Sequence, residues 1–173
     1  EIFVTGTDSI IVSLEWVLTE VFRNPEVMRK AKEEIGLVVG YNRKIEESDM
    51  ESLPYLAAVI KETFRLHPPA TFLVPRTTVE DTEFMGYTIP KDTRVLDNLW
   101  GIGRDSALWV DPFSFNPDRF LGNTTDYRGQ HFRLSPFGAG RRMCSGIPLV
   151  QIIPVVVGLG HCYNLLIGPS KMT

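Results

Sequence analysis

The stretch richest in chemistry is a glycine-rich loop around a single cysteine. Residues 137–146 read FGAGRRMCSG and hold three glycines. Glycine tolerates positive φ and lets a backbone approach a flat, bulky group. Cys144 lies just before an expected helix, whose N-terminus favours the thiolate form, and Arg142 supplies a fixed cation suited to a carboxylate. These residues could hold a thiolate beside an anionic group.

Taken alone, the loop leaves other interpretations open. A lone cysteine beside a glycine turn is most often a buried structural residue. A phosphate loop is a second possibility, although Gly138 to Gly140 lacks the following Lys-Ser/Thr pair. A nucleophilic Cys144 assisted by His161 is a third, and nothing in the spacing positions that pair. With only two cysteines, Cys144 and Cys162, we expect neither a disulfide framework nor a cysteine-based zinc site.

Polar groups elsewhere could support such a site. Glu62 and Arg65 lie three residues apart on an expected helix, where such a pair is usually solvated and worth about 0.2–0.5 kcal/mol. Near the N-terminus, residues 5–9 (TGTDS) place an acid and an alcohol, Asp8 and Ser9, beside a glycine. That pair could relay protons, and an ordinary polar turn of a buried helix is the alternative.

His67 precedes two prolines at the end of the same helix as Glu62. A metal ligand is one interpretation of a histidine in this place. Side chains of this type near a helix C-terminus more often cap the last carbonyl groups. We therefore favour the cap.

The elements that must position these residues follow from periodicity and helix breakers. An apolar stripe over residues 10–21 predicts a long helix that ends near Asn24. Asn24 and Pro25 predict the start of a second helix, which runs to about Ile35 and ends at Gly36. A capping box over residues 48–51 predicts a short helix.

Further along, a helix is expected over residues 54–66, because residues before Pro68 avoid helical geometry. Short strands are expected after it at 72–76, 82–85, 87–89 and 94–96, with a turn at Met85-Gly86. A short helix near 99–103, an irregular region over 105–136 and a buried helix over 147–165 follow. The predicted fold class is mainly α with small β-sheets.

Composition and charge exclude several classes of function. The chain has 173 residues, 43% of them hydrophobic and 23% charged, which is typical of a folded domain rather than a disordered chain. Lys and Arg number 18 against 21 Asp and Glu, giving −3 without a basic cluster, so no nucleic-acid partner is expected. The longest apolar stretch, over 147–159, is shorter than the roughly 20 residues of a membrane span. Because the chain begins with Glu inside an apparent helix, we interpret it as a fragment of a parent protein.

The cysteine loop resembles the haem-binding loop of the cytochrome P-450 family. The match is the spacing Phe-x-x-Gly-x-Arg-x-Cys-x-Gly at Phe137, Gly140, Arg142, Cys144 and Gly146. Other segments agree in the same order, so the resemblance covers nearly the whole chain. Residues 64–69 (FRLHPP) and 100–105 (WGIGRD) are similar to plant microsomal members that oxidise terpenoids and alkaloids.

The resemblance implies a single partial domain, the C-terminal part of the cytochrome P-450 fold. Its implied parts are a distal oxygen-activation helix (1–24), a Glu-x-x-Arg helix (54–66), small sheets (70–97), a meander-like region (105–136), the haem-binding loop (137–146) and a proximal helix (147–165).

The resemblance also implies roles for the residues of the loop. Cys144 would provide the axial thiolate ligand of the iron of haem b (iron protoporphyrin IX). A thiolate ligand donates electron density that favours O–O cleavage. Arg142 and Arg76 would pair with the haem propionates. Phe137 would pack against the macrocycle, and Gly140 and Gly146 would complete the loop that binds the cofactor.

Outside the loop, the resemblance implies three further groups. Glu62, Arg65 and Arg119 would form a structural ion triad that holds the cysteine loop in place. Asp8 and Ser9 would deliver protons, with Ser9 where the family usually has threonine. The implied lining of an apolar substrate pocket is Thr5, Thr71, Phe72, Leu73 and Val74.

The implied function is a haem-thiolate monooxygenase that inserts one oxygen atom from O₂ into an apolar terpenoid, alkaloid or phenylpropanoid. Electrons would come from NADPH through NADPH-cytochrome reductase. An N-terminal anchor outside this segment would hold the parent on the cytosolic face of the endoplasmic reticulum membrane. Two alternatives remain. One is a haem-thiolate isomerase or dehydratase, against which Asp8-Ser9 and the regular spacing at Cys144 argue. The other is a non-catalytic truncated fragment, and we expect this segment to be inactive alone.

Overall fold

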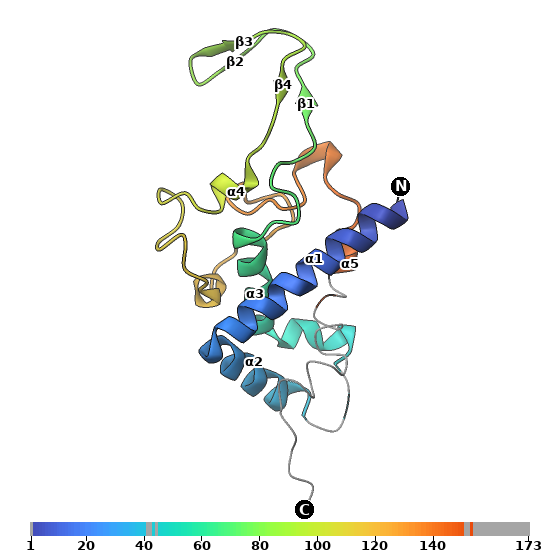
Figure 1. Cartoon of the computed structure of the whole chain (residues 1–173), viewed down its shortest axis with the longest axis vertical. Helices are drawn as coiled ribbons and strands as arrows, with labels where there is room; N and C mark the ends of the chain where they lie inside the picture. Colours follow the sequence, from blue (N-terminus) through green and yellow to red (C-terminus); the bar gives the residue numbers. More distant parts are fainter. Residues whose placement is uncertain (1, 41–42, 44, 151–152, 154–173) are drawn as a thin grey trace, which may run out of the picture.

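A computed structural model describes residues 2–40, 43, 45–150 and 153. Three helices form one part of the molecule, and two small sheets extend from the opposite end (Figure 1). In chain order the elements are α1 (Ile2–Arg23), α2 (Pro25–Val38), η1 (Glu47–Ser52), α3 (Pro54–Leu66), β1 (Arg76–Thr77), β2 (Thr82–Phe84), β3 (Tyr87–Ile89), β4 (Arg94–Val95), α4 (Leu99–Ile102), η2 (Pro117–Phe120), η3 (Gly140–Arg142) and α5 (Ile147–Val150). The mainly helical class with small β-sheets is as predicted.

The junction between α1 and α2 lies where the sequence placed it, but its side-chain contacts differ. Asn24 does not cap α2; its Nδ2 donates instead to the carbonyl and carboxylate oxygens of Glu20, at 2.8 and 3.1 Å. The prediction that Gly36 ends α2 is wrong. The helix continues to Val38, because Ile35 is buried in a small core with Leu53 and Leu56, and this burial offsets the roughly 1 kcal/mol cost of a helical glycine.

The predicted capping box lies two residues earlier than expected. Glu46 and Asp49 form it, and the helix that it starts, η1, is a 3₁₀ helix. Arg43 donates to both carboxylate oxygens of Asp49, and this ion pair, together with the backbone N–H of Glu46, lowers the pKa of Asp49 to about 2. The carboxylate therefore stays ionised and keeps its bond to the Glu46 N–H, which fixes the start of η1.

Two antiparallel two-stranded sheets follow α3. β2 and β3 form a hairpin whose turn has positive φ at Met85 (50°) and Gly86 (82°), so the predicted turn is confirmed. β1 pairs with β4. The strand expected over 72–76 is shorter than predicted: only Phe72 forms a bridge, to Asn98, before β1 begins. Pro75 has no N–H to donate, which accounts for the interruption.

The main core is built around α3, which is buried on nearly every side. It packs against α1, α2 and η2. Val17 and Val21 of α1 belong to the same core cluster as Val150 of α5 and Ile153. The segment after the cysteine loop therefore shares the core to which α1, the helix that carries Asp8 and Ser9, also contributes. The remainder of the helix predicted over 147–165 lies outside the described residues.

Candidate functional site

The backbone of the cysteine loop needs glycine at two positions. Gly138 and Gly140 have φ of 72° and 71°, a region that side chains with a Cβ rarely adopt. The loop is closed by the backbone N–H of Cys144, which donates to the carbonyl oxygen of Phe137 at 2.9 Å. The 3₁₀ turn η3 lies inside this closed loop and carries Arg142, whose side chain is exposed.

Cys144 is an exposed residue, so the interpretation as a buried structural cysteine is wrong. The backbone N–H of Gly146 donates to Sγ at 3.3 Å. A hydrogen bond to sulfur stabilises negative charge on it, which a metal-binding thiolate requires. The sulfur borders a hollow of about 390 Å³, whose other lining residues are Tyr127, Arg128, Met143, Ile147 and Pro148.

The segment that follows α3 meets the cysteine loop, although more than sixty residues separate them in sequence. Arg76 Nη2 lies 3.5 Å from the carbonyl oxygen of Ala139. The side chain of Leu73 comes within 3.7 Å of the position that a Cβ on Gly138 would occupy. Two arginines predicted to face haem propionates, Arg76 and Arg142, are thus carried by adjoining parts of the structure.

The aromatic ring of Phe137 fixes the start of the loop to α3. It packs edge-on against Phe64 of α3, with ring centroids 5.4 Å apart, and against Tyr127 at 5.7 Å. These contacts anchor the loop in the core. Contact between Phe137 and a macrocycle stays a prediction.

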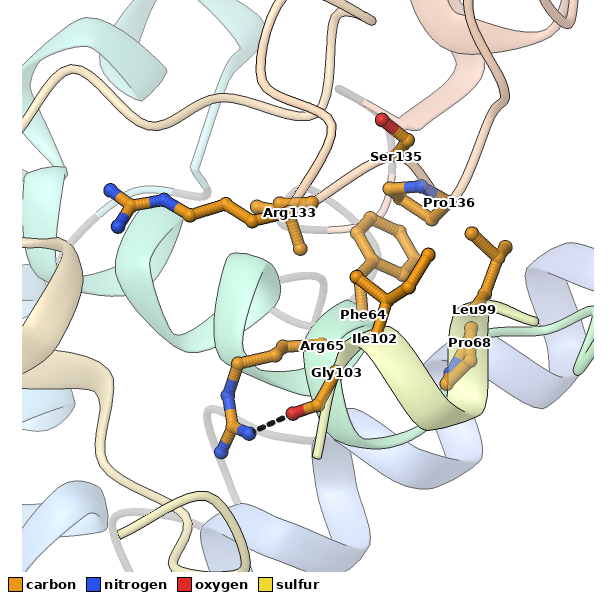
Figure 2. A pocket seen from close by; sticks show the side chains of 10 residues that line it. Phe64, Arg65, Pro68, Leu99, Ile102, Gly103, Arg133, Ser135 and Pro136 are labelled. Atoms are coloured by element: carbon orange, nitrogen blue, oxygen red, sulfur yellow. Dashed lines mark hydrogen bonds between the residues drawn. The ribbon is translucent and has the colours of Figure 1, made fainter. Parts of the chain in front are cut away.

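Glu62 and Arg65 are the centre of a buried ionic network. Their side chains have no exposed surface, and Arg65 donates to both carboxylate oxygens of Glu62 at 2.7 Å. From η2, Arg119 Nε donates to Glu62 Oε1 at 3.1 Å. Arg65 also donates to the backbone carbonyl of Gly103 at the end of α4, and to those of Pro112 and Ser114 in the irregular region. The structure brings the three predicted triad members together, and Figure 2 shows the Arg65–Gly103 bond.

A family model described as cytochrome P450 matches residues 1–152. The chain belongs to the cytochrome P450 family. Among similar curated proteins, cytochrome P450 76A2 of Solanum melongena is 58% identical over 86% of this chain, and an iridoid oxidase of Catharanthus roseus is 56% identical over 87%. A geraniol 8-hydroxylase of Swertia mussotii is 49% identical over 91% of the chain. The chain spans 29–32% of the length of these relatives.

Solved P450 structures confirm the fold. Zebrafish cytochrome P450 with abiraterone gives a TM-score of 0.82 at 33% identity, over 96% of this chain and 37% of that one. The structure with progesterone gives 0.79 at 34% identity, over 89% and 34%. The described elements therefore form part of the P450 fold, as the resemblance implied.

Family membership implies a haem, and the residues of the loop fit one. A thiolate is a strong axial ligand for haem iron, and here Cys144 is an exposed residue whose sulfur accepts a hydrogen bond from a backbone N–H. The glycines leave no side chain on the backbone at two positions of positive φ, which suits close approach to a flat ring. Arg142 is exposed on the same loop, and Arg76 adjoins it; both are fixed cations suited to propionates.

The residues predicted to deliver protons lie near the N-terminus of α1. This helix passes through Gly6 without a break, and no atom lies within 4 Å of the position of a Cβ there. Asp8 and Ser9 are both exposed, and Ser9 Oγ lies 3.5 Å from the carbonyl oxygen of Gly6. The side chain of Thr5 is outside the described part of the structure. A role for Asp8 and Ser9 stays a prediction.

The predicted substrate-pocket segment is exposed in this chain. Phe72 and Val74 are 49% and 83% exposed. The carbonyl oxygen of Thr71 accepts hydrogen bonds from the backbone N–H groups of Leu99 and Trp100, at 3.1 and 3.3 Å. Its backbone position is thus fixed by α4.

The side chain of His67 does not cap α3, contrary to the sequence interpretation. Its backbone N–H donates to the carbonyl oxygen of Thr63, while its Nε2 lies 2.8 Å from a carboxylate oxygen of Glu20 on α1. A charged acceptor on a neighbouring helix makes a stronger hydrogen bond than a helix carbonyl.

No motif in the sequence singled out Gly129, which packs closely against Met143 and Gly138 of the cysteine loop. Its φ is 78°, and a Cβ there would lie 2.9 Å from Met143 Sδ and 3.1 Å from the carbonyl oxygen of Gly138. The only signal in the sequence was a glycine in the irregular region.

We expect Gly129→Ala to displace the loop and to destabilise the protein by about 1–3 kcal/mol through overpacking, beyond the backbone strain. The control is Gly86→Ala, where φ is 82° but no atom lies within 4 Å. Unfolding midpoints and the alkylation rate of Cys144 measure the difference. Equal effects of the two substitutions on both quantities would show that Gly129 does not support the loop.

Proposed function

We propose that this chain is the haem-binding C-terminal part of a haem-thiolate monooxygenase that inserts one oxygen atom from O₂ into an apolar terpenoid. The observation that carries the proposal is the exposed residue Cys144, whose sulfur accepts a hydrogen bond from the Gly146 N–H in a loop that adjoins Arg76. The substrate class rests on relatives named iridoid oxidase and geraniol 8-hydroxylase, since iridoids and geraniol are terpenoids.

Cys144 would ligate the iron, and the Gly146 N–H would limit the charge on the sulfur. Bound haem supplies the iron at which O₂ is activated. Arg142 and Arg76 would hold the propionates by charge-assisted hydrogen bonds and so fix the plane of the ring. Glu62, Arg65 and Arg119 keep the irregular region against α3, which supports the loop.

Near the N-terminus of α1, Asp8 would take up protons from solvent and Ser9 would pass them on to the site where O₂ is activated. Their exposure in this chain suits exchange with water. Thr5, together with Thr71, Phe72, Leu73 and Val74, would line the pocket and exclude water from the substrate. This lining is mostly apolar, as an apolar substrate requires.

The proposed partners follow from the same chemistry. NADPH would supply electrons through a reductase, and the whole protein would lie on the cytosolic face of the endoplasmic reticulum membrane. In the part of the chain that the structure describes, no helix has the length and apolar character needed to cross a membrane.

The test places this chain in a complete P450. Residues of this chain replace the matching segment of the Solanum melongena relative, to give what we call the spliced protein. With haem, we expect the reduced carbon-monoxide complex to absorb at the thiolate position, and Cys144→Ser to abolish that band while Ser145→Ala retains it. A band at the imidazole position in the unsubstituted spliced protein would overturn the proposal.

Two comparisons separate the alternatives. Turnover of a terpenoid that requires NADPH, reductase and O₂ supports a monooxygenase, whereas rearrangement of a peroxide without O₂ would show an isomerase or dehydratase. The 173-residue chain is also incubated with haem on its own. We expect weak binding and no turnover, because this chain spans only 30% of the length of the Solanum melongena relative.

A further inference from the structure

Three side chains join the end of α3 to the C-terminal half of α1. His67 Nε2 lies 2.8 Å from Glu20 Oε1, and the two side chains are 16% and 9% exposed. The imidazole also stacks on the indole of Trp16, with centroids 3.8 Å apart and planes within 3°. We call Trp16, Glu20 and His67 the α1–α3 latch.

The carboxylate of the latch is held at both oxygens. Glu20 Oε1 faces His67, and Oε2 accepts from Asn24 Nδ2 at 3.1 Å. The carboxylate cannot rotate without losing one of these hydrogen bonds, so the direction of the His67 contact is fixed. A hydrogen bond to a carboxylate is also stronger than one between neutral groups.

The imidazole of the latch is neutral at neutral pH. Burial lowers the pKa of His67 below 6.5, and Arg104 and Arg23 act in the same direction, while Glu20 opposes them. These are the charged groups that face it, Glu20 and Arg23 from α1 and Arg104 from the segment after α4. Neutral His67 then carries its proton on Nε2 and donates it to Glu20.

The latch lies at one end of a tethered segment. Pro68 and Pro69 follow His67 directly and restrict the backbone. The segment is next fixed by α4 at the carbonyl of Thr71. At its far end Leu73 lies beside the position that a Cβ on Gly138 would occupy, and Arg76 Nη2 lies 3.5 Å from the carbonyl oxygen of Ala139 in the cysteine loop. Residues 70–74 therefore connect the latch, which holds α1, to the cysteine loop.

We propose that His67 is a positioning residue that, through Glu20 and Trp16, fixes α1 relative to residues 70–74 and so sets the width of the substrate pocket. Its effect on catalysis rests on the proposed function, in which α1 carries Asp8 and Ser9 and residues 70–74 line the pocket. A helix transmits a displacement along its length as a rigid rod, so a loosened latch alters the opposite wall of the pocket.

Two substitutions at His67 separate its hydrogen bond from its ring. His67→Phe keeps an aromatic ring to stack on Trp16 and removes the donor to Glu20. His67→Gln keeps an amide donor and removes the stacking ring. The matched control is Glu15→Gln, an exposed carboxylate on the same helix as Glu20.

In the spliced protein, we expect His67→Phe to raise the KM for geraniol about tenfold and to increase peroxide released per product, as small misplacements do in active sites. Haem content and the carbon-monoxide band stay unchanged. His67→Gln recovers most of the loss, and Glu15→Gln matches the unsubstituted protein. An unchanged KM and peroxide ratio in His67→Phe, or a loss in His67→Gln as large as in His67→Phe, would overturn the proposal.

Tryptophan fluorescence tests the latch independently of activity. As pH falls below 6.5, His67 is protonated with a midpoint below that value, and the imidazolium quenches the stacked Trp16. Because the folded-state pKa is lowered, the stability that His67 contributes is present above pH 6.5 and declines as pH falls. The transition is absent in His67→Gln. A fluorescence transition that persists in His67→Gln contradicts the latch even if the spliced protein is an active monooxygenase. A transition that is present with His67 and absent in His67→Gln supports the latch even if the spliced protein has no monooxygenase activity.

Discussion

Arg65→Leu is expected to leave the irregular region unfolded and the protein without haem. The substitution removes the donor to both oxygens of Glu62, a carboxylate with no exposed surface. Glu62 keeps only the bonds from Arg119 at 3.1 Å and from the Asn116 N–H at 2.8 Å. Removing one partner of a buried ion pair costs about 3–5 kcal/mol, a large part of the 5–15 kcal/mol that stabilises a typical protein. Leucine also removes the donor to the buried carbonyl of Gly103 and to the part-buried carbonyl of Pro112, while that of Ser114 keeps Arg119 as a donor.

The matched control is Arg29→Leu on α2. Arg29 and Glu26 have the same three-residue spacing as Arg65 and Glu62, with N–O distances of 2.9 and 2.5 Å, but their side chains are 53% and 64% exposed. Water replaces the lost partner at an exposed site, so we expect little change in the unfolding midpoint. Urea unfolding and haem content of the spliced protein measure both variants. If Arg65→Leu retains haem and unfolds at the same urea concentration as Arg29→Leu, the network does not hold the loop.

This pair of sites shows what the sequence can and cannot predict. Spacing alone does not distinguish Glu62–Arg65 from Glu26–Arg29, because both are acid and base three residues apart on a helix. Burial separates them, and burial depends on segments far along the chain, such as η2 with Arg119. Only the resemblance to a family predicted the correct partner. The helix boundaries at residues 54–66 needed no such help, because prolines mark both ends.

The two wrong predictions, the end of α2 at Gly36 and the helix cap at His67, have the same physical origin. Gly36 is a sound local stop signal, yet burial of Ile35 in the second core carries α2 past it. His67 is a sound candidate for a cap, yet a carboxylate 47 residues away binds it instead. Local preferences amount to about 1 kcal/mol, and a tertiary contact of similar size overrides them. No local signal reports which contact that is.

Gly103→Ala is the second substitution for which we expect a large loss of stability. The φ of Gly103 is −65°, so alanine meets no backbone strain. The obstacle is space: a Cβ would lie 2.1 Å from the carbonyl oxygen of Arg65 and 3.3 Å from that of Leu99. Because both obstacles are backbone atoms, either α4 or the end of α3 must move.

The movement also breaks a bond of the buried network. The carbonyl oxygen of Gly103 accepts a hydrogen bond from Arg65 Nη1 (Figure 2), so separating the two backbones leaves part of a buried guanidinium without an acceptor. Overpacking costs about 1–3 kcal/mol, and an unsatisfied buried donor adds about 1–3 kcal/mol. We therefore expect Gly103→Ala to approach Arg65→Leu in urea unfolding and in loss of haem.

Gly122→Ala and Gly101→Ala are the controls for this steric explanation. Gly122 has φ of 69° with open space around it, so alanine there costs only the 1–2 kcal/mol or so of left-handed strain. A Cβ on Gly101 meets Asn98 Nδ2 at 2.8 Å, the end of a side chain, so relief requires no backbone shift and costs at most the hydrogen bond that Asn98 Oδ1 accepts from the Gly101 N–H. The expected order of destabilisation places Gly103→Ala well above both. If Gly103→Ala destabilises the protein no more than Gly101→Ala in urea unfolding, then α3 and α4 separate easily. The hydrogen bond from Arg65 to the Gly103 carbonyl is then not what fixes the network.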